Sequence, residues 1–327
     1  MTWRVGVDVG GTFTDLVALD ATGAIIRAKV ATTPRAPEEG LLAALRTLLQ
    51  RVDPTEIVQL SHASTIATNA LLGQVHLELP RVAFITTAGF RDVLEIGRQA
   101  RSSVYDLHVV RPVPLARRED RLTVRERIDY DGSVHEPLDA GDVAAAIAAI
   151  RERGIRSVAV GLLNSYVNDA HERAVADALR AALPGVAVTA SSALVREERE
   201  YERFSTAVVN AALQPIVSAY LERLAGGVRA LGVAAPIFVM QSNGGIAALA
   251  SIVARPAMLI ESGPASGVIA AAALGLAGGV RNVLSFDMGG TTAKAGTIVD
   301  GQPEIAYEFE AAGATHSGRG RAGSGYP

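Results

Sequence analysis

The sequence contains the pattern Asp-x-Gly-Gly-Thr twice, once near each end of the chain. The first copy begins at Asp8 in "WRVGVDVGGTFTDLVALD", and the second begins at Asp287 in "VLSFDMGGTTAKAGTIVD". Each copy leaves an apolar, β-branched run, which is typical of a buried strand, and enters another such run. A Gly-Gly pair between two strands predicts a tight hairpin with no helix directly after the glycines. We therefore expect two related strand–turn–strand units, which a duplication would explain.

These two turns are suited to binding phosphate groups. Glycines let backbone N–H groups approach a phosphate without interference from a Cβ atom, and a following threonine adds a hydroxyl donor. The aspartate that ends each first strand can hold a hydrated Mg²⁺ ion, because a bare carboxylate would repel phosphate. The sequence therefore predicts a site for ATP and Mg²⁺, with Asp8 and Asp287 as the metal-binding residues. The predicted phosphate-binding residues are Gly10, Gly11, Thr12 and Thr14 in the first copy and Gly289, Gly290, Thr291 and Thr292 in the second.

Two structural hairpins without a ligand are the alternative interpretation, although the repeated context favours a nucleotide site. The pattern differs from a Walker A loop, which opens a helix and carries Lys-Ser or Lys-Thr after its second glycine. Asp15 is a candidate for orienting a catalytic water or the metal ion, while hydrogen bonding within the hairpin explains it nearly as well. Together with Asp8 and Asp287 it forms the predicted catalytic set.

Length and composition narrow the class of protein. A chain of 327 residues with 49% hydrophobic and 20% charged residues suits a folded protein of two domains. Its net charge of −3 argues against a nucleic-acid partner. The chain has no cysteine, which excludes disulfides, thiolate metal sites and iron–sulfur clusters. Apolar stretches such as residues 267–279 are too short to span a membrane, so we expect a cytoplasmic protein. Lysine occurs only at Lys29 and Lys294, which we attribute to genomic base composition.

The pattern of apolar runs predicts an α/β fold with mixed sheets. A three-stranded antiparallel meander opens the chain, and a helix follows at residues 38–51. Strands alternate with helices between residues 81 and 194, which predicts a mostly parallel sheet with helices on both faces. Asp131-Gly132 is expected at the tip of a hairpin over residues 121–139. A charged run at residues 195–215 leads into a long helix. The expected domains are residues 1–195 with the first phosphate loop, residues 196–310 with the second, and a disordered or truncated tail at residues 311–327.

At its two Gly-Gly turns the chain resembles the actin-like ATPase superfamily. Further stretches, in order along the chain, resemble the hydantoinase A / 5-oxoprolinase family: "GVDVGGTFTD", "HASTIATNALL", "TTAGFRDVLEIGRQAR", "REYERFSTAVVNAALQP", "ESGPASGVIAAA" and "FDMGGTTAKA". The resemblance implies a two-domain, ribonuclease H-like fold that holds Mg-ATP. It also implies ATP-dependent opening of a cyclic amide such as 5-oxoproline or a hydantoin. The ATP-using subunits of acetone and acetophenone carboxylases belong to the same family, so a ketone substrate and a second, hydantoinase B-type subunit are also implied.

Family members are usually much longer, and in the superfamily an adenosine-binding loop follows the second phosphate loop. Nothing after Asp287 resembles that loop. We therefore expect a fragment or truncated chain whose second domain is incomplete.

Four other stretches contain candidate residues for substrate binding. His62, Thr65 and Asn69 occupy a predicted strand–helix corner, as helix-capping groups or as part of a cleft. Arg98 is a substrate-binding candidate within a charged stretch that is otherwise expected to face solvent. Gly263 begins a helix, where Ser262 or Ser266 would be the cap. Ser242, Asn243 and Gly244 follow a buried strand at its carboxyl end, where α/β sheets bind ligands, although a simple turn also explains them.

The leading hypothesis is an ATP-dependent hydrolase that phosphorylates the carbonyl oxygen of a cyclic amide. An ATP-hydrolysing carboxylase subunit is the alternative within the same family. A sugar kinase would share the first Gly-Gly turn but not the other stretches. An inactive truncated chain that binds a partner is the remaining hypothesis, of another class.

Overall fold

A computed structural model describes most of the chain, and it divides into two compact units. The residues that it describes are 1–73, 77–99, 105–106, 108, 113–288 and 293–306. Unit 1 combines both ends of the described sequence, Met1–Leu77 and Val217–Tyr307, whereas the described part of unit 2 lies within Glu78–Ile216. Helix α7 (Glu200–Ala230) contributes residues to both units, and Pro215 lies inside it, next to the boundary.

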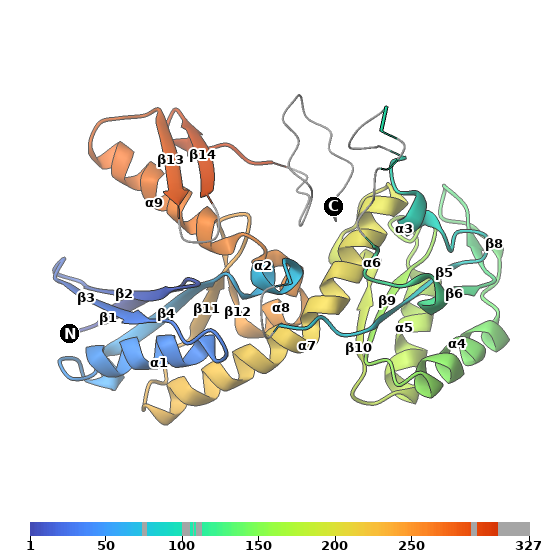
Figure 1. Ribbon diagram of the computed structural model, residues 1–327, viewed down its shortest axis with the longest axis horizontal. Coiled ribbons are helices and arrows are strands. Elements are labelled where there is room, and N and C mark those ends of the chain that lie inside the picture. Colours follow the sequence, from blue (N-terminus) through green and yellow to red (C-terminus); the bar gives the residue numbers. More distant parts are fainter. Residues whose placement is uncertain (74–76, 100–104, 107, 109–112, 289–292, 307–327) are drawn as a thin grey trace. The chain divides into compact units, whose positions relative to one another are not determined.

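Unit 1 is built on a six-stranded mixed sheet (Figure 1). In sheet order the strands are β12 (Ile246–Ala248), β11 (Ile237–Met240), β4 (Ile57–Ser64), β1 (Trp3–Val9), β2 (Phe13–Asp20) and β3 (Ile25–Ala31). The first three strands of the sequence form an antiparallel meander, as predicted, while β4 is parallel to β1 and β11 is parallel to β4. The Gly-Gly turn joins β1 to β2 with no helix after it.

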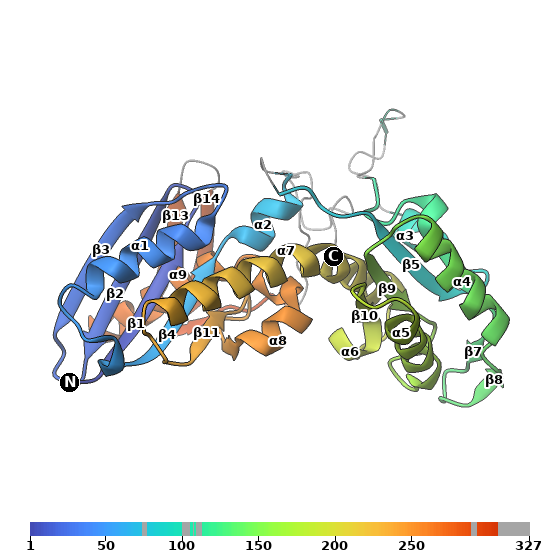
Figure 2. The same ribbon diagram turned by 90° about the horizontal axis from the view of Figure 1, so that it is seen from below.

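Alternation along the strands decides which face of this sheet is covered. In β1, Trp3, Val5, Val7 and Val9 are buried, while the residues between them are exposed. Helix α1 (Pro37–Leu48) packs on β1, β2 and β3, and the second half of α7 lies beside it on the same face (Figure 2). Helix α9 (Ser262–Ala277) packs on β4 and β11 from the opposite face (Figure 1).

The second Asp-x-Gly-Gly-Thr copy forms its own hairpin, also in unit 1. Strands β13 (Val283–Met288), β14 (Ala293–Val299) and β15 (Gln302–Pro303) form an antiparallel sheet that packs on α9. The two copies thus have the same meander, with Asp20 and Asp300 at corresponding turns. Strand β15 ends at Pro303. Residues 307–309 lie outside the described part of the chain.

The remaining helices of unit 1 are short. They are α2 (Ile66–Leu71), α8 (Leu249–Ala254), and the 3₁₀ turns at Pro54–Glu56 and Pro256–Leu259.

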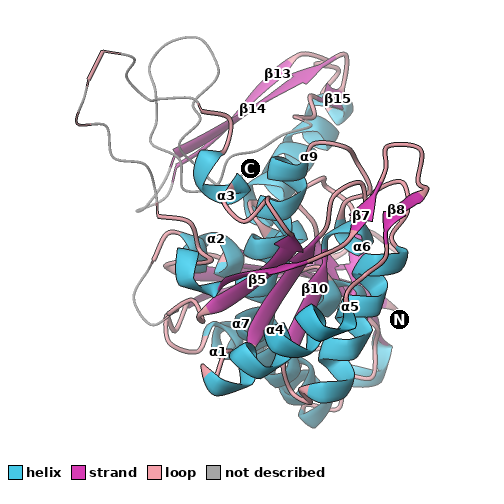
Figure 3. Cartoon of the chain, turned by 90° about the vertical axis from the view of Figure 1, so that its right-hand side faces the viewer, coloured by secondary structure: helices cyan, strands magenta, loops and turns pink. Residues whose placement is uncertain are grey.

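Unit 2 is a four-stranded, all-parallel sheet with helices on both faces, as the alternation of elements predicted (Figure 3). Its strands in sheet order are β10 (Ala187–Ala190), β9 (Ser157–Gly161), β5 (Val82–Thr87) and β6 (Arg121–Val124). Its helices are α3 (Val93–Ile96), α4 (Ala140–Glu152), α5 (Ala170–Ala182), α6 (Ser191–Leu194), the first half of α7, and a 3₁₀ turn at Arg118–Asp120.

Successive side chains of β5 supply two separate cores in unit 2. Ala83 and Ile85 pack with residues of α4 and α5, whereas Val82 and Phe84 pack with residues of α3 and α7. Gly161 at the end of β9 allows one of these contacts, because a Cβ atom there would lie 2.4 Å from the ring of Phe204.

One predicted hairpin is only half correct. The pair β7 (Arg127–Ile128) and β8 (Val134–Glu136) forms it, with Gly132 at a positive φ of 86° at its tip. The preceding segment is instead β6, which pairs in parallel with β5. A local turn signal cannot reveal that longer-range pairing.

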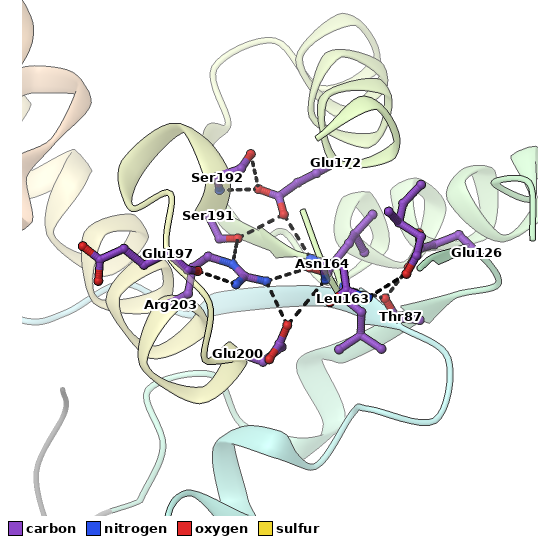
Figure 4. Close-up of polar contacts among 12 residues, drawn as sticks. Thr87, Glu126, Leu163, Asn164, Glu172, Ser191, Ser192, Glu197, Glu200 and Arg203 are labelled. Atoms are coloured by element: carbon purple, nitrogen blue, oxygen red, sulfur yellow. Dashed lines mark hydrogen bonds and ion pairs between the residues drawn. The ribbon is translucent and has the colours of Figure 1, made fainter. Parts of the chain in front are cut away.

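A charged network anchors the start of α7 to the carboxyl ends of the strands in unit 2 (Figure 4). The buried Arg203 guanidinium donates to the Ser191 hydroxyl at 3.2 Å and to the Leu162 carbonyl at 3.0 Å. Ser191 in turn donates to the buried carboxylate of Glu172 at 3.0 Å. The charged run at residues 195–215 therefore includes a fully buried arginine.

Helix α7 is the one described helix long and apolar enough to cross a membrane by those two criteria, but 67% of its apolar window is buried inside the protein. That burial is characteristic of a core helix. Location in the cytoplasm stays a prediction.

Two adjacent glycines in α7 provide a test of this packing. A Cβ atom at Gly227 would lie 2.4 Å from Cδ1 of the buried Leu42 in α1, whereas one at Gly226 would meet nothing within 4 Å. Both substitutions replace glycine by the better helix former alanine, so Gly226→Ala should raise the free energy of unfolding by about 1 kcal/mol. Overpacking should make Gly227→Ala destabilising by about 1–3 kcal/mol. Urea unfolding measures both, and equal stability of the two variants would contradict the α1–α7 contact.

Candidate functional site

The first hairpin places two aspartates opposite each other. Asp8 on β1 is the direct cross-strand partner of Asp15 on β2. Like charges in such a position repel. The pKa of Asp8 is raised to about 6, first by desolvation and then by the charges of Asp15 and Asp287. Asp8 is exposed at the surface, but the surrounding protein removes enough water to disfavour its charged form. The structure therefore brings the three predicted catalytic aspartates into one electrostatic cluster.

The start of α9 lies against this cluster. A Cβ atom on Gly263 would be 3.7 Å from Oδ1 of Asp8 and 3.5 Å from Cγ2 of Thr65. Ser262 donates its hydroxyl hydrogen to the carbonyl of Ser64 at 3.0 Å. Ser262 therefore ties α9 to β4 and does not cap the helix. Ser266 donates to the Gly263 carbonyl, so the predicted capping role is wrong for both serines.

The residue before the helix is Glu261, whose backbone has a positive φ of 62°. Its N–H group donates to the Thr68 hydroxyl at 3.0 Å, and its carboxylate forms an ion pair with Lys294. Lys294 is the cross-strand partner of Asp287, so this pair adjoins the aspartate cluster. Lys294 is one of only two lysines in the chain, whereas no sequence signal marks Glu261.

The first Gly-Gly turn is tight but leaves space above it. The Gly10 N–H group donates to the Phe13 carbonyl at 3.0 Å, and a Cβ atom on Gly11 would meet nothing within 4 Å. Thr12 is exposed, and its carbonyl accepts from the Thr32 N–H group. Thr14 differs from these residues, because it is fully buried and its hydroxyl is bonded to that of Thr32 at 2.9 Å. Gly289, Gly290, Thr291 and Thr292 lie outside the described residues.

The donor set fits a divalent cation that keeps other ligands. Among the described residues, no donor pairs with the Asp8 carboxylate, and no three His, Asp or Glu side chains are grouped to hold a metal alone. Mg²⁺ typically binds through one or two carboxylates, with water and phosphate oxygens completing its shell. Asp8 and Asp287 match that requirement, which keeps them as predicted metal ligands.

The strand–helix corner after β4 contains three further candidates. His62 is buried, with Nε2 2.7 Å from the Tyr220 hydroxyl and Nδ1 3.3 Å from the Val7 carbonyl. Burial lowers the pKa of His62 to about 4, so the ring is neutral. Thr65 and Asn69 are half-buried and bonded to each other at 3.2 Å. The structure thus places His62 inside the core and Thr65 next to Gly263.

The other candidates lie apart from the aspartates or in tight turns. Ser242, Asn243 and Gly244 form the turn between β11 and β12, where the Gly244 φ is +84° and the Asn243 side chain accepts from the Gly245 N–H group. A Cβ atom on Gly244 would lie 2.4 Å from Ile269, which accounts for that glycine structurally. Arg98 belongs to unit 2, where it forms an ion pair with Glu202 at 2.7 Å. Ligand roles at these positions stay predictions.

Comparison with known families agrees with the geometry. The family model described as "Hydantoinase/oxoprolinase N-terminal region" matches residues 4–183, which is more than half of the chain, and "Hydantoinase/oxoprolinase" matches residues 203–319. This chain belongs to the hydantoinase/oxoprolinase family. The resemblance inferred from the sequence motifs is therefore confirmed.

Two of three similar curated proteins have names that describe different reactions, and the third is uncharacterized. An uncharacterized protein of Methanocaldococcus jannaschii is 43% identical over the whole of this chain and 48% of its own length. Caprolactamase subunit alpha of Pseudomonas jessenii is 36% identical, covering 89% of this chain and 42% of its own length. Acetophenone carboxylase gamma subunit of Aromatoleum aromaticum is 33% identical, covering 90% of this chain and 42% of its own length. The chain therefore spans about half the length of each of these three curated relatives.

A solved structure that is similar to this chain has the same fold. The ATP-dependent caprolactamase of Pseudomonas jessenii superposes with a TM-score of 0.80 at 33% identity, covering 90% of this chain and 43% of that one. The predicted actin-like ATPase fold, with mixed sheets and helices, is confirmed.

The crowded aspartates predict an unusual effect of pH on stability. Because the pKa of Asp8 is about 6 in the folded protein and 3.8 ordinarily, the folded state binds more protons between these values. Its stability should then fall as pH rises through that range. We expect Asp8→Asn to raise the melting temperature near pH 8 and to match the wild type near pH 4.

Asp53 provides a control of opposite sign for this measurement. Hydrogen bonds from the Thr55 hydroxyl and then from the Thr55 N–H group lower the pKa of Asp53. Asp53→Asn should therefore lower the melting temperature most at neutral pH and less as the pH falls below the ordinary value. A destabilised Asp8→Asn variant at pH 8 would contradict the proposed charge crowding.

The buried His62 should make the fold sensitive to acid. Its pKa is about 4 when folded and 6.5 ordinarily, so the unfolded state binds more protons between these values and stability is lost as pH falls. The full difference corresponds to about 3 kcal/mol. In urea unfolding, His62→Gln should be less stable at neutral pH but should lack this part of the pH dependence. His135→Gln, at an exposed position in unit 2, should retain the wild-type dependence. An unchanged pH profile for His62→Gln would contradict the buried, neutral ring.

Proposed function

We propose that this chain supplies the ATP-binding machinery of an enzyme that opens a cyclic amide of the 5-oxoproline or hydantoin type. The observation that carries the proposal is the cluster of Asp8, Asp15 and Asp287 beside Gly263, built from two related hairpins at opposite ends of the sequence. Asp15 forms an ion pair with Lys29 at 2.8 Å, whereas no described residue pairs with the Asp8 carboxylate, which suggests that Asp8 is available to a ligand that brings positive charge. Family membership and the similarity to an ATP-dependent caprolactamase favour the Mg²⁺ ion of bound MgATP as that ligand.

The proposed reaction activates a poor electrophile. The amide carbonyl oxygen attacks the terminal phosphoryl group of ATP, forming an O–P bond while the bond to ADP breaks. Water then adds to the activated carbon, and the tetrahedral intermediate expels the amine, which takes up a proton, so that the C–N bond opens and an acyl phosphate is left. A second water hydrolyses the acyl phosphate to the carboxylate and inorganic phosphate. The protein's contribution to phosphoryl transfer is mainly positioning and neutralisation of charge.

The residues have distinct proposed roles. The backbone at Gly10, Gly11 and Thr12 would bind phosphate, with the second Gly-Gly turn doing so from the other hairpin. When bound at Asp8 and Asp287, Mg²⁺ would supply charge neutralisation on the phosphate oxygens. Asp15 would orient water. Thr14 supports the turn from below, since its buried hydroxyl is bonded to Thr32.

An ATP-hydrolysing carboxylase subunit is the second candidate function. The match to the acetophenone carboxylase gamma subunit favours it, and both functions would use the same aspartate cluster. The names "subunit alpha" and "gamma subunit" belong to multi-subunit enzymes. We propose that this chain likewise acts with a second, hydantoinase B-type subunit.

A substrate panel distinguishes these functions. ATP hydrolysis should be measured with 5-oxoproline, hydantoins, caprolactam, and ketones with bicarbonate, with and without the purified partner subunit. Stimulation by a cyclic amide supports the hydrolase, and stimulation that needs both ketone and bicarbonate supports the carboxylase. Absence of measurable ATP binding by calorimetry would instead favour an inactive, partner-binding chain.

Two glycines of α9 test the position of the site. Gly263→Ala adds a methyl group beside the Asp8 carboxylate without a steric clash, whereas Gly267→Ala meets nothing within 4 Å. Both should be at least as stable as the wild type, because alanine favours a helix by up to about 1 kcal/mol. Gly263→Ala should lose roughly tenfold or more in MgATP affinity or ATPase rate, since its methyl group occupies space next to Asp8. Equal activity of the two variants would place the ligand elsewhere.

A further inference from the structure

The distribution of lysine in this chain is unusual. Of 31 lysine and arginine residues, only Lys29 and Lys294 are lysines. Each lies in one of the two related hairpin sheets and next to an acidic cross-strand partner, Asp15 for Lys29 and Asp287 for Lys294. Where composition replaces lysine by arginine almost everywhere, a remaining lysine marks a position at which the two are not equivalent.

The two hairpins differ at one corresponding position. When Asp8 is aligned with Asp287, Lys294 takes the place of Asp15, and both residues are direct cross-strand partners of the aligned aspartates. The first hairpin therefore has two negative charges facing each other, and the second has a negative and a positive charge. Lys294 is also the more enclosed lysine, with 22% of its side chain exposed against 57% for Lys29.

Lys294 is held by a strained residue. Its ion-pair partner Glu261 has a φ of 62° in the left-handed region, directly before α9. A non-glycine residue in this conformation costs free energy and persists where its side chain has a task. Glycine would adopt this backbone conformation without strain. The presence of glutamate instead indicates that its side chain is needed at this position.

The chemistry of lysine suits a phosphate contact here. Its ammonium group is a compact point charge with three donors on a flexible stem, and it binds phosphate in that form. The planar guanidinium of arginine would instead engage the Glu261 carboxylate with two parallel hydrogen bonds and stay on it.

We propose that Lys294 is the cation that contacts the terminal phosphate of the nucleotide, and that Glu261 is the positioning residue that holds its ammonium group beside Asp287. This inference rests on the proposed function, because it assumes that polyphosphate binds at the aspartate cluster.

The test is isothermal titration calorimetry with MgATP, magnesium tripolyphosphate and adenosine. Lys294→Met should weaken MgATP and tripolyphosphate binding by roughly tenfold or more while adenosine binding is unchanged. Lys294→Arg should keep the melting temperature but not restore the affinity. Glu261→Gly should melt at a higher temperature, since its strain is removed, and should still bind MgATP more weakly.

Two controls separate these effects from general ones. Asp300→Gly relieves a similar positive φ of 52° at a hairpin tip and should raise the melting temperature without changing affinity. Arg281→Met removes one exposed positive charge before β13 and should leave affinity unchanged.

Each outcome bears on a different statement. The wild type binds MgATP if the proposed function is correct. Unchanged MgATP affinity in Lys294→Met, or a wild-type affinity in Lys294→Arg, would then overturn the role of Lys294 alone. Tripolyphosphate binding without ATP binding would support Lys294 and contradict the nucleotide function. A wild type that binds neither would overturn both.

Discussion

The proposed site in unit 1 depends on the crowding of carboxylates around Asp8. The register of β1 and β2 sets Asp8 directly opposite Asp15, and the second hairpin adds the charge of Asp287. Strand pairing alone does not require charged residues at these positions, and the raised pKa of Asp8 is the energetic consequence of having them there. Glycine at position 263 then allows a helix to begin beside the carboxylate without covering it. The fold thus holds a concentration of negative charge in an accessible place.

In the described part of the chain, buried carboxylates in unit 2 have hydrogen-bond or ion-pair partners, unlike Asp8. In unit 2, Glu172 accepts four hydrogen bonds from backbone and serine donors, and Asp120 is paired with Arg81 and Arg153. Glu126 accepts from Thr87 and is bonded to a histidine ring. These groups are buried and their charges are satisfied, so they stabilise the arrangement of strands and helices. The contrast with Asp8, for which no described residue supplies a donor, separates carboxylates that support the scaffold from one that is available to a ligand.

Local pattern predicted much of this architecture, and long-range packing decided the rest. The Gly-Gly turns predicted both meanders because a turn and its flanking strands are adjacent in sequence. Thr14 was placed with the phosphate ligands, but its burial depends on Gly40 of α1, where a Cβ atom would lie 2.5 Å from its hydroxyl. His62 is enclosed by Tyr220, which is far away in the sequence. The left-handed conformation of Glu261 likewise has no sequence signal, since glycine is the residue that normally marks it.

Composition can hide a functional signal as well as explain one. The scarcity of lysine fits a bias toward arginine, and that interpretation accounts for the arginines scattered over both units. It does not account for the positions of the two remaining lysines. A bias that acts on the whole chain would not keep lysine specifically in the two sheets that contain the Asp-x-Gly-Gly-Thr hairpins. Because the bias toward arginine is strong, each remaining lysine indicates a position where arginine is not equivalent. Lys294, enclosed between Asp287 and a strained glutamate, is the exception whose surroundings most clearly call for a compact, mobile positive charge.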